Sequence, residues 1–287
     1  MVAAKTLSPP AASGEPGAIP IARADKIEGM AKGMAVLEAF DTQRQRLNAT
    51  LAAERAGITR AAARRHLLTL AHLGYLETDG SYFWLAAKVL RFSGSYLATA
   101  RLPRAVQPTL NRLALQTRES FSAVVLDGNE VVIVARSGFE WKRTPDDKAP
   151  PAGMLLAYGL HLGARLPSHA TSTGRVLLAA WPGPQFDAWL QNRVDSGGLP
   201  RLTVHTVTDP HKLRELVDQV RRDDCCVSSE EHELSVHALA VPLRDMQGRT
   251  VAALNVVTSP QRLTAHALRQ DLLPLLLDAA RELRPLL

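Results

Sequence analysis

The stretch that decides the fold of this chain runs from Gly57 to Glu77 and reads GITRAAARRHLLTLAHLGYLE. Thr59 is a residue type that caps helix N-termini, and Gly74 is one that ends helices. The spacing of the alanines and leucines between them predicts a helix from Thr59 to about His72. The question is what this helix does with its arginines.

A helical wheel with about 100° per residue separates two sides of this helix. The apolar side holds Ala63, Leu67 and Leu70. The opposite side holds Arg60, Ala61 and Arg64, with Arg65 on its flank. An ordinary surface helix with solvated arginines would show the same pattern, so the neighbouring segments must decide.

Those neighbours predict a winged helix-turn-helix. A first helix is expected within residues 26–40, ending near Phe40, and a second within 47–57, ending at the helix-terminating Gly57. After the third helix, YLE and YFWL flank Asp79 and Gly80, which predicts a small hairpin. Two helices, a glycine turn, a third helix and a hairpin together favour DNA as the partner of the arginines.

The distribution of charge supports this interpretation. The whole chain carries a formal net charge of +6, and residues 26–101 hold eleven basic against six acidic residues. Almost all the excess positive charge therefore belongs to the N-terminal third. A modest excess can simply aid solubility, but its confinement to one small domain favours a polyanionic partner.

The rest of the chain predicts an α+β domain. Residues 86–120 read as helical on both sides of Pro103, where a break or kink is expected. Residues 121–138 and 236–260 read as hairpins, and helices are expected over 170–181, 184–194, 209–223 and, closing the chain, 263–287. Antiparallel pairs with helices between and after them favour α+β over a doubly wound parallel sheet.

Several general features bound the class of protein. At 287 residues the chain is long enough for two domains, and its two cysteines, Cys225 and Cys226, are adjacent and unsuited to a disulfide framework. This cysteine usage favours a reducing, cytoplasmic compartment. Residues 1–25 lack a continuous apolar segment and read as a disordered tail, not a signal peptide, and no transmembrane span is expected.

No enzyme motif stands out. The segment EEHELSVH carries Glu231, His232, Glu233 and His237, but its histidines are five residues apart, not the four of the zinc motif HExxH. We interpret them as surface residues beside a strand. Neither a GxSxG elbow nor a phosphate-binding GxxxxGK[ST] loop is present. We therefore expect no catalytic residues, no metal and no cofactor.

Thr171, Ser172 and Thr173 favour binding over catalysis. They lie where a helix is expected to begin, so hydroxyls and unpaired backbone amides converge beside its positive end. Such a place suits a carboxylate. A simple N-cap without a ligand is an equally good explanation of these three residues alone.

At this point the chain resembles the IclR family of bacterial transcriptional regulators over residues 26–287. The resemblance rests on GITRAAARRHLLTLAHLGYLE, SYFWLAAKVL, RLPSHATSTGRVLLA and SSEEHELSVHALAVPLRDMQGRTVAALNVVTSPQRLT, in this order and spacing. It implies a winged helix-turn-helix domain at 26–86, a linker helix at 87–103 and an effector-binding domain of GAF-like fold at 104–287. It also implies assembly as a homodimer or a dimer of dimers.

Within the family, residues 150–180 are most similar to regulators of aromatic acid catabolism, the PobR, PcaR and PcaU type. This similarity implies an effector such as 4-hydroxybenzoate, protocatechuate or a β-ketoadipate pathway intermediate. One departure concerns the recognition helix, where the family usually has serine and threonine and this chain has Ala61 and Ala62. Base reading must then rest more on the arginines.

The resemblance also assigns residues to the two sites. The residues expected at DNA are Thr59, Arg60, Ala61, Arg64, Arg65 and Ser81. Those expected in the effector pocket are Leu155, Tyr158, Ser172, Thr173, Ser228, Val236, Ala238, Asn255 and Val257. His169 and His237 lie close to these in sequence and are further candidates for a phenol or carboxylate, although each could equally be a structural residue.

The sequence thus predicts a cytoplasmic transcriptional regulator that reads double-stranded operator DNA and senses a small aromatic carboxylate, with coupling through the helix around residues 88–101. Two alternatives stay open at this level. One is a small-molecule enzyme with an accessory DNA-binding domain, and the other is an architectural DNA binder that needs no ligand.

Overall fold

The structure is a computed structural model, and it describes residues 21–41, 44–137 and 161–287. The chain divides into two compact units, Met1–Thr99 and Ala100–Leu287. Most of the expected tail, residues 1–20, lies outside the described residues.

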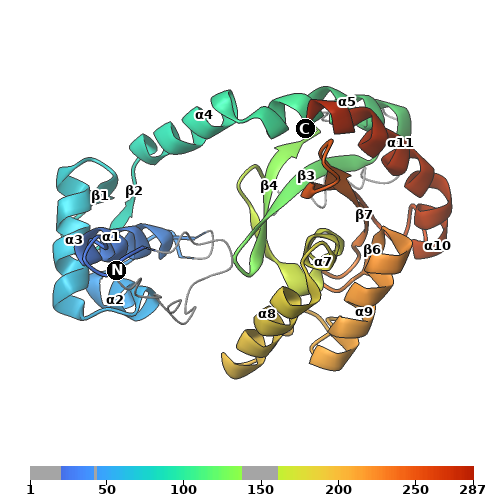
Figure 1. The fold of residues 1–287 in the computed structure, drawn as a ribbon. Coiled ribbons are helices and arrows are strands. Elements are labelled where there is room, and N and C mark those ends of the chain that lie inside the picture. Colours follow the sequence, from blue (N-terminus) through green and yellow to red (C-terminus); the bar gives the residue numbers. More distant parts are fainter. Residues whose placement is uncertain (1–20, 42–43, 138–160) are drawn as a thin grey trace, which may run out of the picture. The chain divides into compact units, whose positions relative to one another are not determined.

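The first unit contains three helices and a two-stranded hairpin (Figure 1). They are α1 (Glu28–Glu38), α2 (Ala49–Ala56), α3 (Arg60–His72), β1 (Leu76–Thr78) and β2 (Phe83–Leu85). Leu47 forms an isolated bridge to Phe83 and so adds a short third segment to the hairpin. The core consists of fully buried side chains from the three helices and this bridge: Val36, Leu47, Ala52, Ala63 and Leu67. The predicted winged helix-turn-helix is therefore confirmed, element by element.

The helical segment between the hairpin and the larger sheet breaks earlier than the sequence suggested. It consists of a 3₁₀ turn η1 (Ala87–Val89), α4 (Leu90–Thr99) and α5 (Arg101–Thr117). The break expected at Pro103 lies at Ala100, whose backbone is extended. Pro103 is the third residue of α5, where its missing N–H would have had no partner within the helix. A proline in the first turn is thus compatible with the helix, and the expectation of a break there was wrong.

The second unit is built on a six-stranded antiparallel sheet with the order β5-β4-β3-β8-β7-β6. Its strands are β3 (Ser120–Asp127), β4 (Glu130–Arg136), β5 (Arg165–Pro167), β6 (Cys226–Ser229), β7 (His237–Arg244) and β8 (Thr250–Thr258). The two predicted hairpins, β3–β4 and β7–β8, meet at the centre through β3 and β8. The predicted α+β class with an antiparallel sheet is confirmed.

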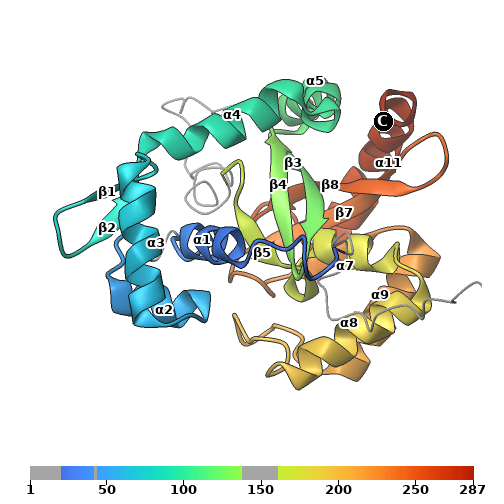
Figure 2. The same cartoon turned by 60° about the vertical axis from the view of Figure 1, so that its left-hand side comes forward.

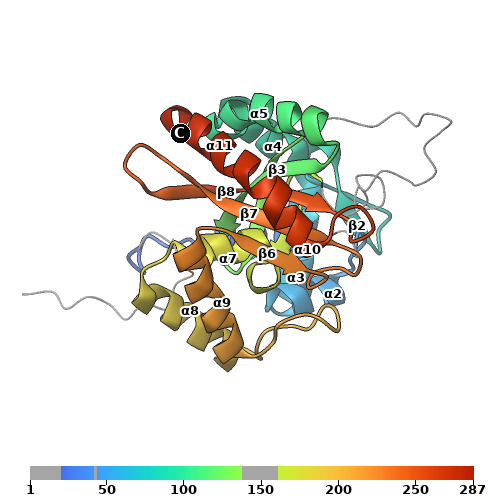
Figure 3. The ribbon, with the colours of Figure 1, turned by 90° about the vertical axis from the view of Figure 1, so that its right-hand side faces the viewer.

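Helices cover both faces of this sheet (Figures 2 and 3). The helices after β5 are α7 (Ser172–Ala179), preceded by a 3₁₀ turn η2 (Ser168–Ala170), then α8 (Gly183–Asp195) and α9 (Pro210–Asp223). One face packs against α5 and α11 (Leu273–Leu283) through Val106, Leu110, Leu239, Leu254 and Leu276. The other packs against α7 and α9 through Val124, Ile133, Val176, Val220 and Ala240.

Two expectations about this unit need correction. Strands β5 and β6 were not predicted, because each is only three or four residues long and neither sequence, RLP or CVSS, alternates between apolar and polar residues. The expected continuous closing helix over 263–287 is instead divided into α10 (Ala265–Ala267), a π-helical turn η3 (Leu268–Leu272), α11 and a 3₁₀ turn η4 (Arg284–Leu286). Pro274 is the second residue of α11, in the first turn, where a backbone N–H would have no partner within the helix.

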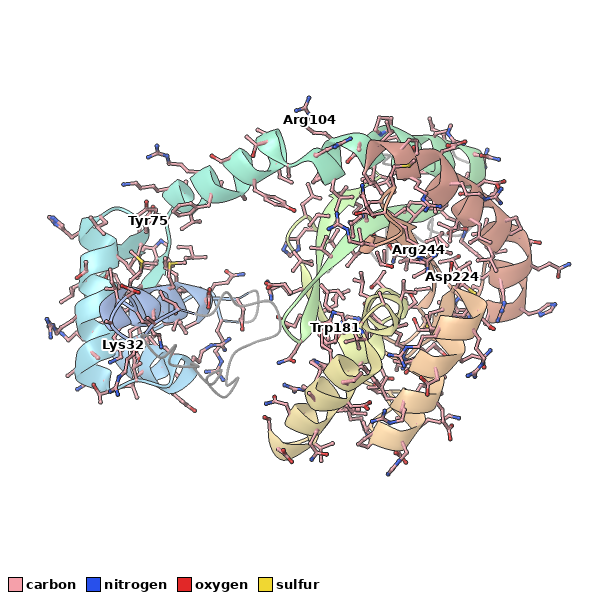
Figure 4. The ribbon with its side chains drawn as sticks, viewed as in Figure 1. Lys32, Tyr75, Arg104, Trp181, Asp224 and Arg244 are labelled. Carbon is pink, nitrogen blue, oxygen red and sulfur yellow. The ribbon has the colours of Figure 1, made fainter. Side chains whose placement is uncertain are left out.

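An ion pair ties the end of α9 to the sheet (Figure 4). Asp224 ends α9 in the left-handed conformation, with φ of 55°. Its carboxylate accepts two hydrogen bonds from the guanidinium of Arg244 on β7, one of them at 2.6 Å. Both side chains are partly exposed, so the pair contributes at most about 1 kcal/mol and mainly fixes where β6 starts.

Candidate functional site

The helix-turn-helix is held by local hydrogen bonds at each helix end. Asn48 caps α2 by accepting from the N–H groups of Thr50 and Leu51, both at 3.0 Å. Gly57 ends α2 in the left-handed conformation with φ of 62°, a conformation that favours glycine. Thr59 then caps α3 by accepting from the Ala62 N–H at 3.3 Å. These caps fix the angle at which α3 leaves the turn.

Helix α3 presents an unneutralised basic face. Ala63 and Leu67 are fully buried, whereas Arg60, Arg64 and Arg65 are exposed. Among the described residues, none of these three arginines forms an ion pair. Thr59 and Ala61 are exposed on the same helix. The arrangement predicted from the helical wheel is therefore present, although DNA contact by these residues stays a prediction.

The wing hairpin is stiffened by a residue that the sequence reasoning missed. The guanidinium of Arg46 lies over the Trp84 ring at 4.7 Å and the Tyr82 ring at 5.6 Å from their centroids, and it pairs with Asp79. Asp79 also accepts from the N–H of Ser81 at 3.0 Å. Ser81, expected at DNA, is thus exposed at the tip of a turn that these contacts order.

The second unit holds a cavity between the sheet and the start of α7. It encloses about 570 Å³ of space that no atom fills, its open mouth included. The cavity is lined by Ser122, Val124, Ile133, Leu166, Ala170, Thr171, Ser172, Thr173, Ser228, Glu231, His232, Glu233, Val236, Ala238, Asn255 and Val257.

The register of the sheet explains why its residues meet there. Ala238 on β7 is paired with Ser228 on β6 and with Val257 on β8, so their side chains share one face. Asn255 lies two residues before Val257 and therefore on the same face. The Ser122 hydroxyl of β3 donates to Asn255 Oδ1 at 2.6 Å, so this polar pair forms part of the cavity wall.

The start of α7 forms a second wall. The Thr171 hydroxyl accepts from the Gly174 N–H at 3.1 Å and donates to the Pro167 carbonyl at 3.2 Å. None of the hydrogen bonds among the described residues uses the N–H or the hydroxyl of Ser172 or Thr173, which are 1% and 3% exposed. Ser172 and Thr173 both line the cavity, and their four donors, at the positive end of a helix, have no acceptor among the described residues.

Close packing at the start of α7 requires glycine at position 174. A Cβ built on Gly174 would lie 2.1 Å from the carbonyl oxygen of Ser168 and 2.4 Å from its Cα. The 3₁₀ turn η2 can lie directly against the first turn of α7 only because Gly174 has no side chain.

A buried ion pair joins α7 to the third wall, the loop 230–236. Arg175 is 1% exposed and donates from Nη1 to Glu231 Oε1 at 2.6 Å, and from Nη2 to Glu231 Oε2. Its Nε donates to the His169 carbonyl at 3.0 Å. Burial lowers the pKa of this guanidinium, but the hydrogen bonds to Glu231 outweigh burial and raise its pKa overall. The pair is therefore a fixed zwitterion inside the domain.

Cys226 lies beside this pair. Burial raises the pKa of its thiol to about 11, although the nearby Arg175 acts in the opposite direction. Cys225 and Cys226 are both free and buried. A neutral buried thiol is a poor nucleophile, so neither cysteine is suited to covalent chemistry.

The structure brings together seven of the eleven residues that the sequence assigned to the effector pocket. Those that line the cavity are Ser172, Thr173, Ser228, Val236, Ala238, Asn255 and Val257. Leu155 and Tyr158 lie outside the described residues. That the seven bind a ligand stays a prediction.

The two candidate histidines do not line the cavity. The buried His169 donates from Nε2 to the Pro200 carbonyl at 3.0 Å and so holds the segment around residue 200. His237 pairs with Thr258 on β8, and strand alternation turns its side chain away from the face that carries Ala238. Both residues are structural in this arrangement, which corrects their assignment to the pocket.

The sequence reasoning missed three residues in EEHELSVH. Glu231, His232 and Glu233 all line the cavity, although they were interpreted as surface residues beside a strand. Burial lowers the pKa of the His232 imidazole, and the neighbouring Glu233 opposes this shift. The sequence signal that could have identified these residues was the pair of acids flanking a histidine just before a predicted strand.

The described residues offer neither a metal site nor a membrane span. Within 21–41, 44–137 and 161–287, no group of three or more His, Cys, Asp or Glu side chains could hold a metal ion. No helix in these ranges is long and apolar enough to cross a membrane.

Each of the two units matches a known family model. Residues 29–80 match the model described as the IclR helix-turn-helix domain. Residues 94–284 match the model described as the bacterial transcriptional regulator IclR C-terminal domain. Together the two models cover most of the chain.

Individual relatives are similar over nearly their full length. The chain is 50% identical over 262 residues, 91% of its length and 92% of theirs, to the p-hydroxybenzoate hydroxylase transcriptional activator of Acinetobacter baylyi. It is 45% identical to the crystallised inducer-binding domain of a PobR double mutant from Acinetobacter in complex with 3-hydroxybenzoic acid, with a TM-score of 0.55, covering 64% of this chain and 98% of that one.

A third relative was solved with another hydroxybenzoate. It is an IclR homologue from Microbacterium hydrocarbonoxydans complexed with 4-hydroxybenzoate, 27% identical, with a TM-score of 0.64, covering 90% of this chain and 98% of that one. The relatives named by function are regulators, which decides against the enzyme alternative.

Proposed function

Because the chain belongs to the IclR family of bacterial transcriptional regulators, we propose that α3 and the wing bind operator DNA and that the cavity beside α7 binds a small aromatic carboxylate such as 4-hydroxybenzoate or protocatechuate. The observation that carries the ligand half is the set of donors of Ser172 and Thr173, which no hydrogen bond among the described residues uses, in a cavity that is also lined by apolar side chains. We also propose that the regulator acts in the cytoplasm as a homodimer or a dimer of dimers.

The DNA half rests on the free basic face of α3. Its three exposed arginines form no ion pair within the described part of the chain, so each is available for a phosphate or the edge of a guanine. Ala61 brings no hydroxyl and little bulk, so the helix can approach the groove closely while the arginines read it. Thr59 and Ser81, at the helix start and the wing tip, are placed for backbone contacts.

This half is tested with Arg64→Ala and Arg65→Ala. Each should weaken binding by about 1–3 kcal/mol if its arginine contacts a base, or reduce the salt slope by about one if it contacts phosphate. The measurement is fluorescence anisotropy on a duplex that the protein has selected from a random pool. Arg112→Ala, an exposed arginine of the second unit, is the control. Unchanged affinity and salt slope in both α3 variants would contradict the placement of α3 on DNA.

The ligand half rests on complementary surfaces. The N–H and hydroxyl groups of Ser172 and Thr173, at the positive end of α7, suit a carboxylate. The aromatic ring would pack against Val124, Ile133, Val236 and Val257. Two relatives solved with 3-hydroxybenzoic acid and 4-hydroxybenzoate support a ligand of this size and class.

Calorimetric titration with 4-hydroxybenzoate and 3-hydroxybenzoate tests this half. The double variant Ser172→Ala, Thr173→Val removes both hydroxyls but keeps the backbone donors, so affinity should fall about 10- to 100-fold, the loss of two modest hydrogen bonds. Ser196→Ala, at the exposed end of α8, is the control. Equal affinity of the double variant and the wild type would show that the carboxylate binds elsewhere.

Regulation requires that the ligand favour one arrangement of the protein over another, because equal affinity for both would shift nothing. We propose that α4 and the start of α5 carry this coupling between the cavity and the DNA-binding unit. A symmetric oligomer would then read two half-sites separated by whole helical turns.

A further inference from the structure

The walls of the cavity differ in electrostatic character. The start of α7 contributes the uncharged hydroxyl and N–H groups of Ser172 and Thr173 at a positive helix end. The loop 230–236 instead contributes three consecutive titratable residues, Glu231, His232 and Glu233. A ligand with a negative end and a hydroxyl group would therefore meet two chemically different walls.

The loop is held rigidly at its base. The Glu230 N–H donates to the Val236 carbonyl at 2.7 Å, and the Ser235 N–H donates to Glu230 Oε1 at 2.8 Å. Glu230 and Ser235 both take the left-handed conformation, with φ of 56° and 62°. This closed turn fixes the backbone on both sides of His232.

Side chains from other segments hold the same loop from outside. The hydroxyls of Thr203 and Thr206 donate to the carbonyls of Glu230 and Glu231, both at 2.6 Å. The carboxylate of Glu231 is held by Arg175, as described above, and also accepts from the Val207 N–H at 3.3 Å. The backbone that carries His232 is therefore preorganised, which lowers the cost of binding through its side chain.

His232 is the histidine that lines this cavity. Its ring is half-buried, and none of the hydrogen bonds among the described residues uses either of its nitrogens. His169, by contrast, already donates to a carbonyl and His237 faces the opposite side of the sheet. A neutral imidazole offers one donor and one acceptor, and here both remain available for a ligand.

The charges around His232 select the ligand group that it meets. The acidic residues next to it in the cavity lining are Glu233, which is exposed and forms no ion pair among the described residues, and Glu231, which pairs with Arg175. A carboxylate placed here would be repelled by Glu233, and no unpaired cation of the described lining would offset this. A phenolic hydroxyl can donate to the imidazole without such a penalty.

We propose that His232 is a specificity-determining residue that accepts a hydrogen bond from the hydroxyl of the aromatic effector while the carboxylate lies at α7. This inference rests on the proposed function, since it assumes that the cavity binds a hydroxybenzoate. It orients the ligand and explains how the site would distinguish hydroxylated from unsubstituted benzoates.

A ligand series in calorimetry tests the proposal, with benzoate, 3-hydroxybenzoate and 4-hydroxybenzoate titrated into each protein. The wild type should bind one hydroxybenzoate about 10-fold more tightly than benzoate, the contribution of one buried hydrogen bond. His232→Phe keeps a ring of similar shape but no nitrogen. It should remove this preference by weakening the hydroxybenzoate and leaving benzoate unchanged.

Two further variants make the result specific. His232→Gln retains an acceptor and should keep part of the preference, and His266→Phe, on the exposed side of α10, should keep all of it. Thermal unfolding of each variant checks that the domain is folded; if His232→Phe is not, the His232→Gln series decides.

The outcomes separate this inference from the proposed function. Equal loss of benzoate and hydroxybenzoate in His232→Phe, an unchanged preference, or no preference in the wild type would overturn the role of His232 while the cavity remains the site. If none of the three ligands binds the wild type, the proposed function fails and the inference fails with it.

Discussion

Helix α3 of the first unit and helix α7 of the second begin alike. Each has a threonine N-cap whose hydroxyl accepts the N–H three residues on, at 3.3 Å for Thr59 and 3.1 Å for Thr171. Each carries arginine within its first two turns. Yet Arg60, Arg64 and Arg65 of α3 are exposed and free of ion pairs among the described residues, whereas Arg175 of α7 is buried and pairs with Glu231.

The difference lies in what packs around each helix. Only one side of α3 is buried, so its polar first turn faces outward and suits an extended polyanion such as DNA. Every residue of α7 from Ser172 to Leu178 is buried, so its polar first turn faces a cavity and suits one small anion. On the proposed function, the same local motif would therefore recognise two kinds of anion, depending on its tertiary surroundings.

The largest expected effect is on stability, when the buried arginine of α7 and an exposed arginine of α3 are each replaced. Arg175→Met leaves the Glu231 carboxylate buried without its cation and should lower the free energy of unfolding by about 3–5 kcal/mol. Arg65→Met on α3 should change it by no more than about 0.5 kcal/mol, since that side chain is solvated. Urea unfolding followed by circular dichroism reports on both units, and tryptophan fluorescence reports on the second unit once Trp84 of the first is replaced by phenylalanine in every variant.

A double variant isolates the ion pair from the packing of Arg175. Adding Glu231→Met to Arg175→Met removes the orphaned carboxylate and should recover part of the lost stability. If the double variant is less stable than Arg175→Met, the buried carboxylate is not the main cost and this account of the pair is wrong.

The next effect concerns the close contact at the start of α7. Gly174→Ala places a methyl group on the Ser168 backbone and should cost about 1–3 kcal/mol, as overpacking does. Gly183→Ala, at the start of α8, has no atom within 4 Å of the added carbon and should be neutral or slightly stabilising. Thermal unfolding compares the two, and equal melting temperatures would contradict the close packing of η2 on α7.

Removing the threonine N-caps of α3 and α7 should have a smaller effect on stability, and the effect should differ between the two helices. Thr59→Ala and Thr171→Ala should each cost about 1 kcal/mol, the usual value of a lost N-cap. Thr171→Ala should cost more than Thr59→Ala, because the buried Gly174 N–H and Pro167 carbonyl lose their partner and water cannot replace it. Equal losses in urea unfolding would show that the α7 cap is less enclosed than the structure indicates.

The smallest expected effect is a gradual dependence of the stability of the second unit on pH. Burial lowers the pKa of His169, His232 and His237, so the unfolded chain binds protons more readily than the folded one. Stability should therefore be full at neutral pH and fall as the pH drops through about 6.5 towards the lower folded values. Urea unfolding at several pH values measures this, and replacing the three histidines by glutamine should flatten the slope.

The sequence was sufficient for the helix-turn-helix because its signals are local. Thr59, Gly57 and the spacing of Ala63 and Leu67 lie within one short segment and act there. The second unit was predicted at the level of its hairpins and most helices. Its edge strands β5 and β6 were missed because pairing with the neighbouring strand, more than their own sequence, makes them strands.

The cavity could be predicted only in part. The expected helix start indicated Ser172 and Thr173, and the resemblance added the strand residues. The ion pair between Arg175 and Glu231 spans 56 residues and leaves no local pattern. One error was avoidable: His237 and Ala238 are consecutive in a predicted strand, so they could not both face the pocket. The position of His232 depended on the loop hydrogen bonds, which only the fold reveals.

The central claim is that α3 and α7 bind separate anions. It is tested most directly by the operator affinity of the Ser172→Ala, Thr173→Val double variant. Fluorescence anisotropy measures this affinity without ligand and with 4-hydroxybenzoate at a concentration that saturates the wild type. The account predicts an operator affinity equal to that of the wild type without ligand and loss of the ligand-induced change, in whichever direction the wild type shows it. A ligand-free affinity as low as that of Arg64→Ala, or a ligand response as large as that of the wild type, would contradict it.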